Sequence, residues 1–140
     1  MQQFLSLDYG TKFIGVAIAD DMNLIADELT TLDNTSQAIP HLISLINTHQ
    51  ITTLVVGIPY HENNTAAEMR VEIEHFVADL VRQLSPQPAV HFIDEYGTSQ
   101  LAEKALVGSD RKKLRDPAMK KLVNQKAAKI ILQTYLDGKR

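Results

Sequence analysis

Acidic side chains stand where two apolar runs of this 140-residue sequence end. Asp8 follows residues 4–7, and Asp94 and Glu95 follow residues 89–93. In open sheets, ligands and reacting groups gather beyond the carboxyl ends of the strands. The sequence therefore predicts a site of converging carboxylates at one end of a sheet. Because successive strand residues face opposite ways, we expect one member of the adjacent acidic pair to face Asp8, and we favour Glu95.

Residues 4–20 have the pattern of a β-hairpin, with two apolar runs on either side of a polar turn that contains Gly10. An acidic residue that only begins such a turn needs no further role, so the local sequence leaves both interpretations of Asp8 open. Gly15 lies inside the second run, where a glycine marks a bulge or the close approach of another backbone or a ligand.

The remaining segments alternate between expected strands and helices. We expect a third antiparallel strand at residues 24–32, a central strand covered on both faces at 51–59, and a short buried strand at 89–93. We expect helices at residues 39–49 after cap candidates at 33–36, from a capping box at 65–68 to residue 84, at 98–107, and at 117–136 behind the cap Asp116. Residues 109–115 are expected to form a basic loop. This order predicts an α/β protein with a single domain over residues 1–140, built on a mixed sheet covered by helices.

The composition excludes several classes of protein. The sequence has no cysteine, which rules out disulfides and thiolate metal sites, and no apolar run is long enough to span a bilayer or to form a secretory signal. We therefore expect a cytoplasmic protein with no membrane partner. The five histidines show no metal-ligand spacing, so we expect them to pack or to lie at the surface.

The net charge of −3 hides a strong asymmetry along the chain. Residues 1–103 carry three basic and fourteen acidic side chains, a net of −11, whereas residues 104–140 carry eleven basic and three acidic ones, a net of +8. A basic segment of this kind binds polyphosphates by neutralising phosphates and releasing counterions. A helix with a solvated lysine face would have the same composition, so both interpretations stay open here.

Four groups of residues, taken in order, resemble a known family. They are Asp8-Tyr9-Gly10 with Gly15-Val16-Ala17, then Val55-Val56-Gly57-Ile58-Pro59, then Asp94-Glu95 with Thr98 and Ala102-Glu103, and last Ala127-Ala128 with Ile131-Leu132-Gln133 and Tyr135-Leu136. In these motifs the chain resembles the YqgF/RuvX family, described as pre-16S rRNA nucleases or Holliday-junction-resolvase-like proteins. The resemblance implies an RNase H-like fold: a five-stranded mixed sheet with strands 1–3 antiparallel, two further strands parallel to the first, and helices on both faces.

The resemblance also implies a reaction and a cofactor. It implies a metal-dependent nuclease that hydrolyses phosphodiester bonds in structured RNA, namely the 16S rRNA precursor, or in DNA junctions. Mg²⁺ or Mn²⁺ on hard oxygen ligands would activate a water and neutralise charge on the phosphate. By resemblance, the metal ligands are Asp8 with Glu95 or Asp94, and Asn124 completes the catalytic set three residues before the alanine pair.

Three positions depart from the family pattern near this expected site. The family carries an aspartate where this chain has Asn124, a basic residue where it has Phe13, and an arginine where it has Tyr96. An amide oxygen can ligate a hard cation but brings no negative charge, so metal affinity should fall.

The departures keep alternatives to a nuclease open. One is a non-catalytic RNA- or ribosome-associated module that keeps the fold and the basic tail. Sugar kinases and actin-like ATPases have a phosphate turn like residues 8–11, but they bind nucleotide between two such domains, and 140 residues make one.

Basic residues near the expected site are candidates for contacts to nucleic acid. A flexible basic segment next to such a site can follow a phosphate backbone. The candidates are Lys12, Arg111, Lys112, Lys113 and Arg115.

Overall fold

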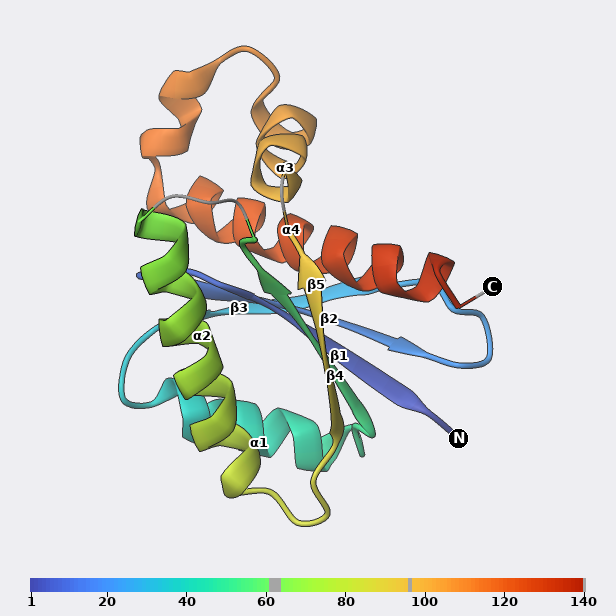
Figure 1. Cartoon of the computed structure of the whole chain (residues 1–140). Coiled ribbons are helices and arrows are strands. Elements are labelled where there is room, and N and C mark those ends of the chain that lie inside the picture. Colours follow the sequence, from blue (N-terminus) through green and yellow to red (C-terminus); the bar gives the residue numbers. More distant parts are fainter. Residues whose placement is uncertain (61–63, 96, 140) are drawn as a thin grey trace.

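A computed structural model describes residues 1–60, 64–95 and 97–139. The elements of the described chain, labelled in Figure 1, are β1 (Gln3–Tyr9), β2 (Phe13–Asp20), β3 (Asp27–Asp33), α1 (Ala38–Thr48), β4 (Thr53–Ile58), α2 (Asn64–Arg82), β5 (Ala89–Asp94), α3 (Thr98–Val107), the 3-10 helix η1 (Arg111–Arg115) and α4 (Pro117–Asp137). The expected hairpin, the central strand and the last helix behind Asp116 are all present.

The five strands form one mixed sheet in the order β3-β2-β1-β4-β5. β1 pairs antiparallel with β2 and parallel with β4, β2 pairs antiparallel with β3, and β4 pairs parallel with β5. The fold predicted from the sequence is therefore confirmed. β1 is the middle strand, so its carboxyl end, where Asp8 lies, has a strand on each side.

Helices cover both faces of the sheet, with α1 and α2 on one side and α4 on the other (Figure 1). The alternation of side chains along β1 shows how this comes about. Leu5 and Leu7 belong to the core under α1 and α2, whereas Phe4 belongs to the core under α4. Ser6 also faces α4, where its Oγ donates a hydrogen bond of 2.7 Å to the carbonyl oxygen of Ala128. The same alternation places Asp8 on the α4 face.

α4 lies unusually close to β2. A Cβ atom added at Gly15 would stand 1.9 Å from the carbonyl oxygen of Asn124 and 2.9 Å from the backbone nitrogen of Gln125. No side chain fits there, because atoms that are not bonded need well over 3 Å. The glycine was expected to mark a bulge or the close approach of another backbone or a ligand, and what approaches it is the backbone of α4. The ladder between β2 and β3 is irregular one step further on, between Val16 and Ala17.

The prediction of a buried strand at residues 89–93 is wrong. β5 is an edge strand with one neighbour in the sheet, and most of its side chains are exposed. Only Val90 and Ile93 are half-buried, and Phe92 is 36% exposed. The apolar composition of the run signalled a strand correctly but did not indicate which strands or helices would cover it.

Several element ends also differ from expectation. Residues 111–115 form η1 rather than a loop, and α1 begins behind Gln37, which makes no side-chain capping bond, rather than behind residues 33–36. α3 begins behind Gly97, which has a positive φ of 78°, so the expected caps Thr98 and Ser99 are the first residues of the helix itself. The capping box expected at residues 65–68 depends on a side chain, that of residue 65, outside the described part, and Tyr96 lies outside the described residues.

None of the helices in the described part of the chain combines the length and the apolar composition needed to cross a membrane.

Candidate active site

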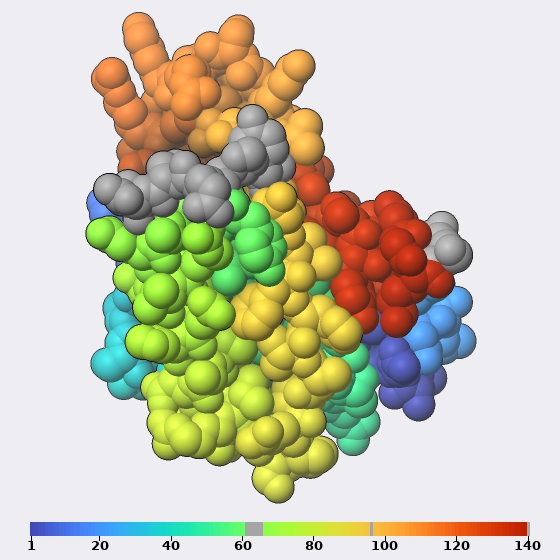
Figure 2. Space-filling model, viewed as in Figure 1, coloured from blue at the N-terminus to red at the C-terminus, as the bar shows by residue number. Residues whose placement is uncertain are grey.

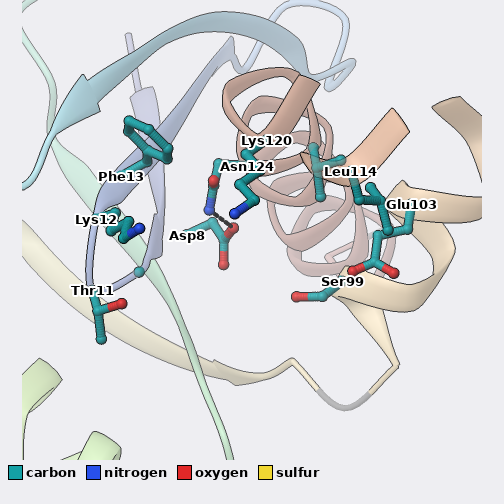
Figure 3. Close-up of a pocket in the computed structure, with 11 residues that line it drawn as sticks. Asp8, Thr11, Lys12, Phe13, Ser99, Glu103, Leu114, Lys120 and Asn124 are labelled. Atoms are coloured by element: carbon teal, nitrogen blue, oxygen red, sulfur yellow. Dashed lines mark hydrogen bonds between the residues drawn. The ribbon is translucent and has the colours of Figure 1, made fainter. Parts of the chain in front are cut away.

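Asp8 and Asn124 meet where β1 ends beneath α4. Asp8 is 5% exposed, and the Nδ2 of Asn124 donates a hydrogen bond of 2.9 Å to its Oδ2 (Figure 3). The contact joins residues 116 positions apart in the chain, and it depends on the close approach of α4 at Gly15, which pairs with Asp8 across the hairpin. Two residues that were predicted for the site from separate segments of the sequence are therefore direct hydrogen-bond partners.

Glu95 enters the same place from the end of β5. Its backbone nitrogen still bonds to the carbonyl oxygen of Ile58 on β4, at 3.1 Å, so the residue keeps its register with the sheet. A Cβ atom at Gly57 would stand 3.0 Å from Oε2 of Glu95 and 2.4 Å from the side chain of Ile131 on α4. The missing side chain at Gly57 therefore leaves the room that the carboxyl group of Glu95 occupies.

Burial and their mutual contact shift the pKa values of the two carboxyl groups. Burial raises the pKa of Asp8 above its ordinary value, and the hydrogen bond from Asn124 works against that rise. Burial and then the charge of Asp8 raise the pKa of Glu95 to about 8. Oε2 of Glu95 is a buried atom with no hydrogen-bond partner among the described residues. Near neutral pH the pair therefore holds one proton, and one of its oxygens lacks a partner.

An open pocket of about 420 Å³ lies in front of Asp8 and Asn124. Figure 3 shows its walls: the turn after β1 and the start of β2 on one side, α4 behind, and α3 with Leu114 of η1 on the other side. The side chains that line it and that Figure 3 labels include Thr11, Lys12, Phe13, Ser99, Glu103 and Lys120. Carboxylates, hydroxyls and lysines therefore line one concave surface beyond the strand ends.

The structure separates the predicted site residues into two groups. Asp8, Glu95 and Asn124 come together, and Lys12 lines the same pocket. Asp94, by contrast, is exposed on β5. Within the described residues, no set of three or more histidine, aspartate or glutamate side chains is placed to hold a metal ion. In the described part of the chain, the acidic pair at the strand ends is therefore Asp8 and Glu95.

The basic residues of η1 lie at the rim of this end of the molecule. Lys112, Lys113 and Arg115 are exposed, whereas Arg111 is held 3.3 Å from Oε2 of Glu103. Figure 2 shows this part of the chain, in orange, projecting from the body with long side chains extended into solvent. These residues surround the approach to the pocket rather than its floor.

Two features of the pocket were missed by the sequence reasoning. Lys120 lies one helical turn before Asn124, and Glu103 lies on α3 across the pocket. The four-residue spacing from Asn124 could have indicated Lys120, because residues four apart share one side of a helix. Glu103 was expected only as part of a family motif, with no role in the site.

Phe13 stands where the family has a basic residue, and a positive charge from another residue lies next to it. The ammonium group of Lys121 lies 5.4 Å from the centre of its ring and 3.7 Å from Oδ1 of Asp33. The aromatic ring is thus a support for a lysine that comes from α4.

The strand order, with β1 antiparallel to β2 and parallel to β4, is that of an RNase H-like fold. Two solved structures share this fold. RuvC of T. thermophilus in complex with a Holliday junction substrate aligns over 99% of this chain and 96% of its own, with a TM-score of 0.58 and 12% identity. The Fowlpox virus resolvase with Holliday junction DNA aligns over 98% of both chains, with a TM-score of 0.61 and 10% identity.

The chain belongs to the RuvX family, described as "Holliday junction resolvase", whose model matches residues 2–138. A relative from Bacteroides fragilis is 35% identical over 140 residues, covering 100% of this chain and 99% of its own. One from Geobacillus kaustophilus is 36% identical over 142 residues, covering 97% and 98%. Both relatives bear the name "Putative pre-16S rRNA nuclease".

Proposed function

We propose that this protein is a metal-dependent nuclease that hydrolyses phosphodiester bonds in structured RNA and acts on the 16S rRNA precursor. The observation that carries the proposal is the pair of carboxyl groups, Asp8 and Glu95, held together at the ends of β1 and β5 beside an open pocket. Burying two acids side by side is costly unless a cation joins them. The names of the relatives supply the substrate class.

The residues present fit Mg²⁺ or Mn²⁺. Both cations prefer oxygen ligands, and the unpartnered Oε2 of Glu95 and the carboxylate of Asp8 are such donors. The Nδ2 of Asn124 donates a hydrogen bond to Asp8, so its amide oxygen is the atom left to face a cation. Asp8 and Glu95 would therefore hold the ion, with Asn124 as a neutral third group. When bound, the ion supplies positive charge to the phosphate and lowers the pKa of a water.

The chain's own residues account for the proton and the approach of the substrate. Hydrolysis joins a water oxygen to phosphorus and breaks the bond from phosphorus to one ester oxygen. A proton leaves the water, and the departing sugar oxygen gains one from solvent. The Asp8–Glu95 pair beside the pocket, once ionised, can accept the water's proton. Lys12 at the pocket and the exposed lysines of η1 would neutralise flanking phosphates.

A second candidate, RNA binding without cleavage, is favoured by one specific observation. Across the described ranges, no third acidic side chain joins Asp8 and Glu95, and the position that could have held one is Asn124. A weaker metal site with an intact basic rim would bind RNA and cut it slowly or not at all.

A cleavage assay with Mn²⁺ and a fragment of precursor 16S rRNA tests the proposal. Asp8→Asn should lower the rate at least about 10²-fold, because it removes a charged ligand from the site. Circular dichroism should show an unfolding temperature nearly equal to that of the unaltered protein. Burial already disfavours a charge on Asp8, as its raised pKa indicates, so the uncharged amide should be tolerated there.

Glu74→Gln is the matched control for that assay. It removes one carboxylate from the exposed side of α2, away from the pocket, and should leave cleavage unchanged. Cleavage that survives Asp8→Asn would place the chemistry elsewhere. If the unaltered protein binds RNA but never cuts it, the second candidate function is supported. If it cuts a four-way DNA junction and not RNA, the proposal that RNA is the substrate is wrong.

A further inference from the structure

Three cationic side chains at the pocket or its rim differ in whether a carboxylate already neutralises them. Arg111 lies 3.3 Å from Glu103, and Lys121 lies 3.7 Å from Asp33. Lys120, like Lys12 on the opposite wall, lines the pocket and has no carboxylate within 4.0 Å among the residues that the structure describes. Its charge is therefore available to an incoming anion, whereas those of the other two are partly satisfied within the protein.

Lys120 is also the cation that α4 directs into the pocket. It lines the pocket together with Asp8 and Asn124, and Figure 3 shows its side chain pointing from α4 toward Asp8. It precedes Asn124 by four residues, so the two side chains lie on the same side of the helix. Because the backbone of Asn124 is held against Gly15, the position of Lys120 one turn away is also held.

The surroundings of Lys120 select the kind of anion. Asp8 already accepts a hydrogen bond from Asn124, and it interacts with Glu95, so the carboxyl pair is occupied without the lysine. Glu103 on the opposite wall is held by Arg111. A phosphate that enters beside Asp8 would bring negatively charged oxygens to a free ammonium group, which binds such oxygens strongly where water is partly excluded.

We propose that Lys120 is a catalytic residue that binds a non-bridging oxygen of the phosphate to be cleaved. This inference rests on the proposed function for the reaction itself. As water attacks phosphorus and the ester bond breaks, negative charge stays on the non-bridging oxygens, and the ammonium group stabilises it. The lysine neither takes up nor releases a proton in this step. Its positive charge reaches the phosphate directly, whereas the neutral Asn124 contributes no charge to a bound cation.

Kinetics with the same RNA fragment test the catalytic part of the proposal. Lys120→Met should lower the rate at saturating RNA by about 10²-fold, a typical effect of removing one charge-stabilising donor, while KM changes much less. Lys120→Arg should restore part of the rate, because it keeps the charge. Lys120 is exposed, so neither variant should unfold the protein.

Lys139→Met is the matched control. It removes the same charge from an exposed lysine just beyond the far end of α4, and the helical stretch from Lys120 to Asp137 alone spans about 26 Å at 1.5 Å per residue. The rate for this variant should stay unchanged. Equal rates for Lys120→Met and Lys139→Met would overturn the proposal.

Binding measurements separate this inference from the proposed function. Fluorescence anisotropy with the RNA fragment in EDTA gives the slope of log K against log salt, with no cleavage taking place. Lys120→Met should reduce that slope by about 0.7–0.9, the value for one lost phosphate contact, and Lys139→Met should not. If the unaltered protein never cuts RNA, the proposed function fails, yet the slope still decides whether Lys120 touches a phosphate. An unchanged slope would reject the contact.

Discussion

Three side chains, Asp8, Glu95 and Asn124, give the site its chemical character, and the neutral one matters as much as the two acids. By donating a hydrogen bond to Asp8, Asn124 favours the ionised form of that carboxyl group, so the proton of the pair rests on Glu95. An acidic side chain at position 124 would instead place a third charge in the same small volume. The amide therefore relieves repulsion in the free protein, and it brings less charge to a bound cation.

The raised pKa of Glu95 predicts a dependence of stability on pH. Folding raises this pKa from 4.5 to about 8, so the folded protein keeps a proton that the unfolded chain loses in this range. The stability contributed by Glu95 should therefore be fully present below about pH 4.5 and be lost as pH rises toward 8. Glu95→Gln removes the need to ionise a buried group. In thermal unfolding, the difference in stability between this variant and the unaltered protein should favour the variant more at pH 8 than at pH 5.

The control for this pH experiment is again Glu74→Gln, whose carboxylate is exposed. Its difference from the unaltered protein should be the same at both pH values. A difference for Glu95→Gln that does not grow between pH 5 and pH 8 would contradict the arrangement of the carboxyl pair.

At the scale of elements, the contact between α4 and the hairpin decides whether the site exists. Small side chains on the α4 face of the sheet, at Ser6, Gly15 and Gly57, let the helix and Glu95 approach. The hydrogen bond from Ser6 to Ala128 fixes the middle of the helix, and the contact at Gly15 fixes the turn that bears Asn124.

Gly15→Ala should therefore disturb both stability and activity. The added Cβ would stand 1.9 Å from a backbone oxygen, and neither β2 nor α4 can move without losing buried contacts. We expect a loss of about 2–3 kcal/mol in the free energy of unfolding, measured by urea denaturation, together with a lower cleavage rate. Gly138→Ala, where the nearest atom would be 3.5 Å away, should cost far less. Equal losses for the two variants would argue against the close approach of α4.

Sequence reasoning predicted most of these elements because their signals are local. Alternating apolar runs indicated the hairpin, and Asp116 with Pro117 indicated the start of α4, where Asp116 Oδ1 accepts from the backbone nitrogen of Ala118 at 2.9 Å. The exposure of β5 could not be predicted, since it depends on strand order. The strand-end acids were accessible to the same reasoning. For Lys120 the sequence offered only its four-residue spacing from Asn124, and the packing of α4 is what places it at the pocket.

Across the whole molecule, the charge of the chain is sorted in space as it is in sequence. The acidic first part forms the sheet and the helices on one of its faces, while the basic last part forms η1 and α4 beside the pocket. A polyanion would thus meet the molecule at the end where the carboxyl pair lies. Long-range attraction of this kind speeds association and weakens in salt.

Reversing two charges on η1 tests this picture. Lys112→Glu combined with Lys113→Glu should weaken binding of the RNA fragment and flatten its salt dependence, because both side chains are exposed at the rim. The cleavage rate at saturating RNA should change less than the affinity, since neither residue lines the pocket. Fluorescence anisotropy over a range of salt concentrations measures the first effect, and a salt slope equal to that of the unaltered protein would exclude η1 from the interface.

The place of α4 in the chain has a consequence for timing. All five strands precede α4, and one wall of the pocket, with Asn124 and Lys120, belongs to this helix. While the protein is being translated, the sheet can form before that wall has left the ribosome. A nascent chain therefore carries Asp8 without a completed pocket, and the site of the proposed nuclease is assembled only after α4 has left the ribosome.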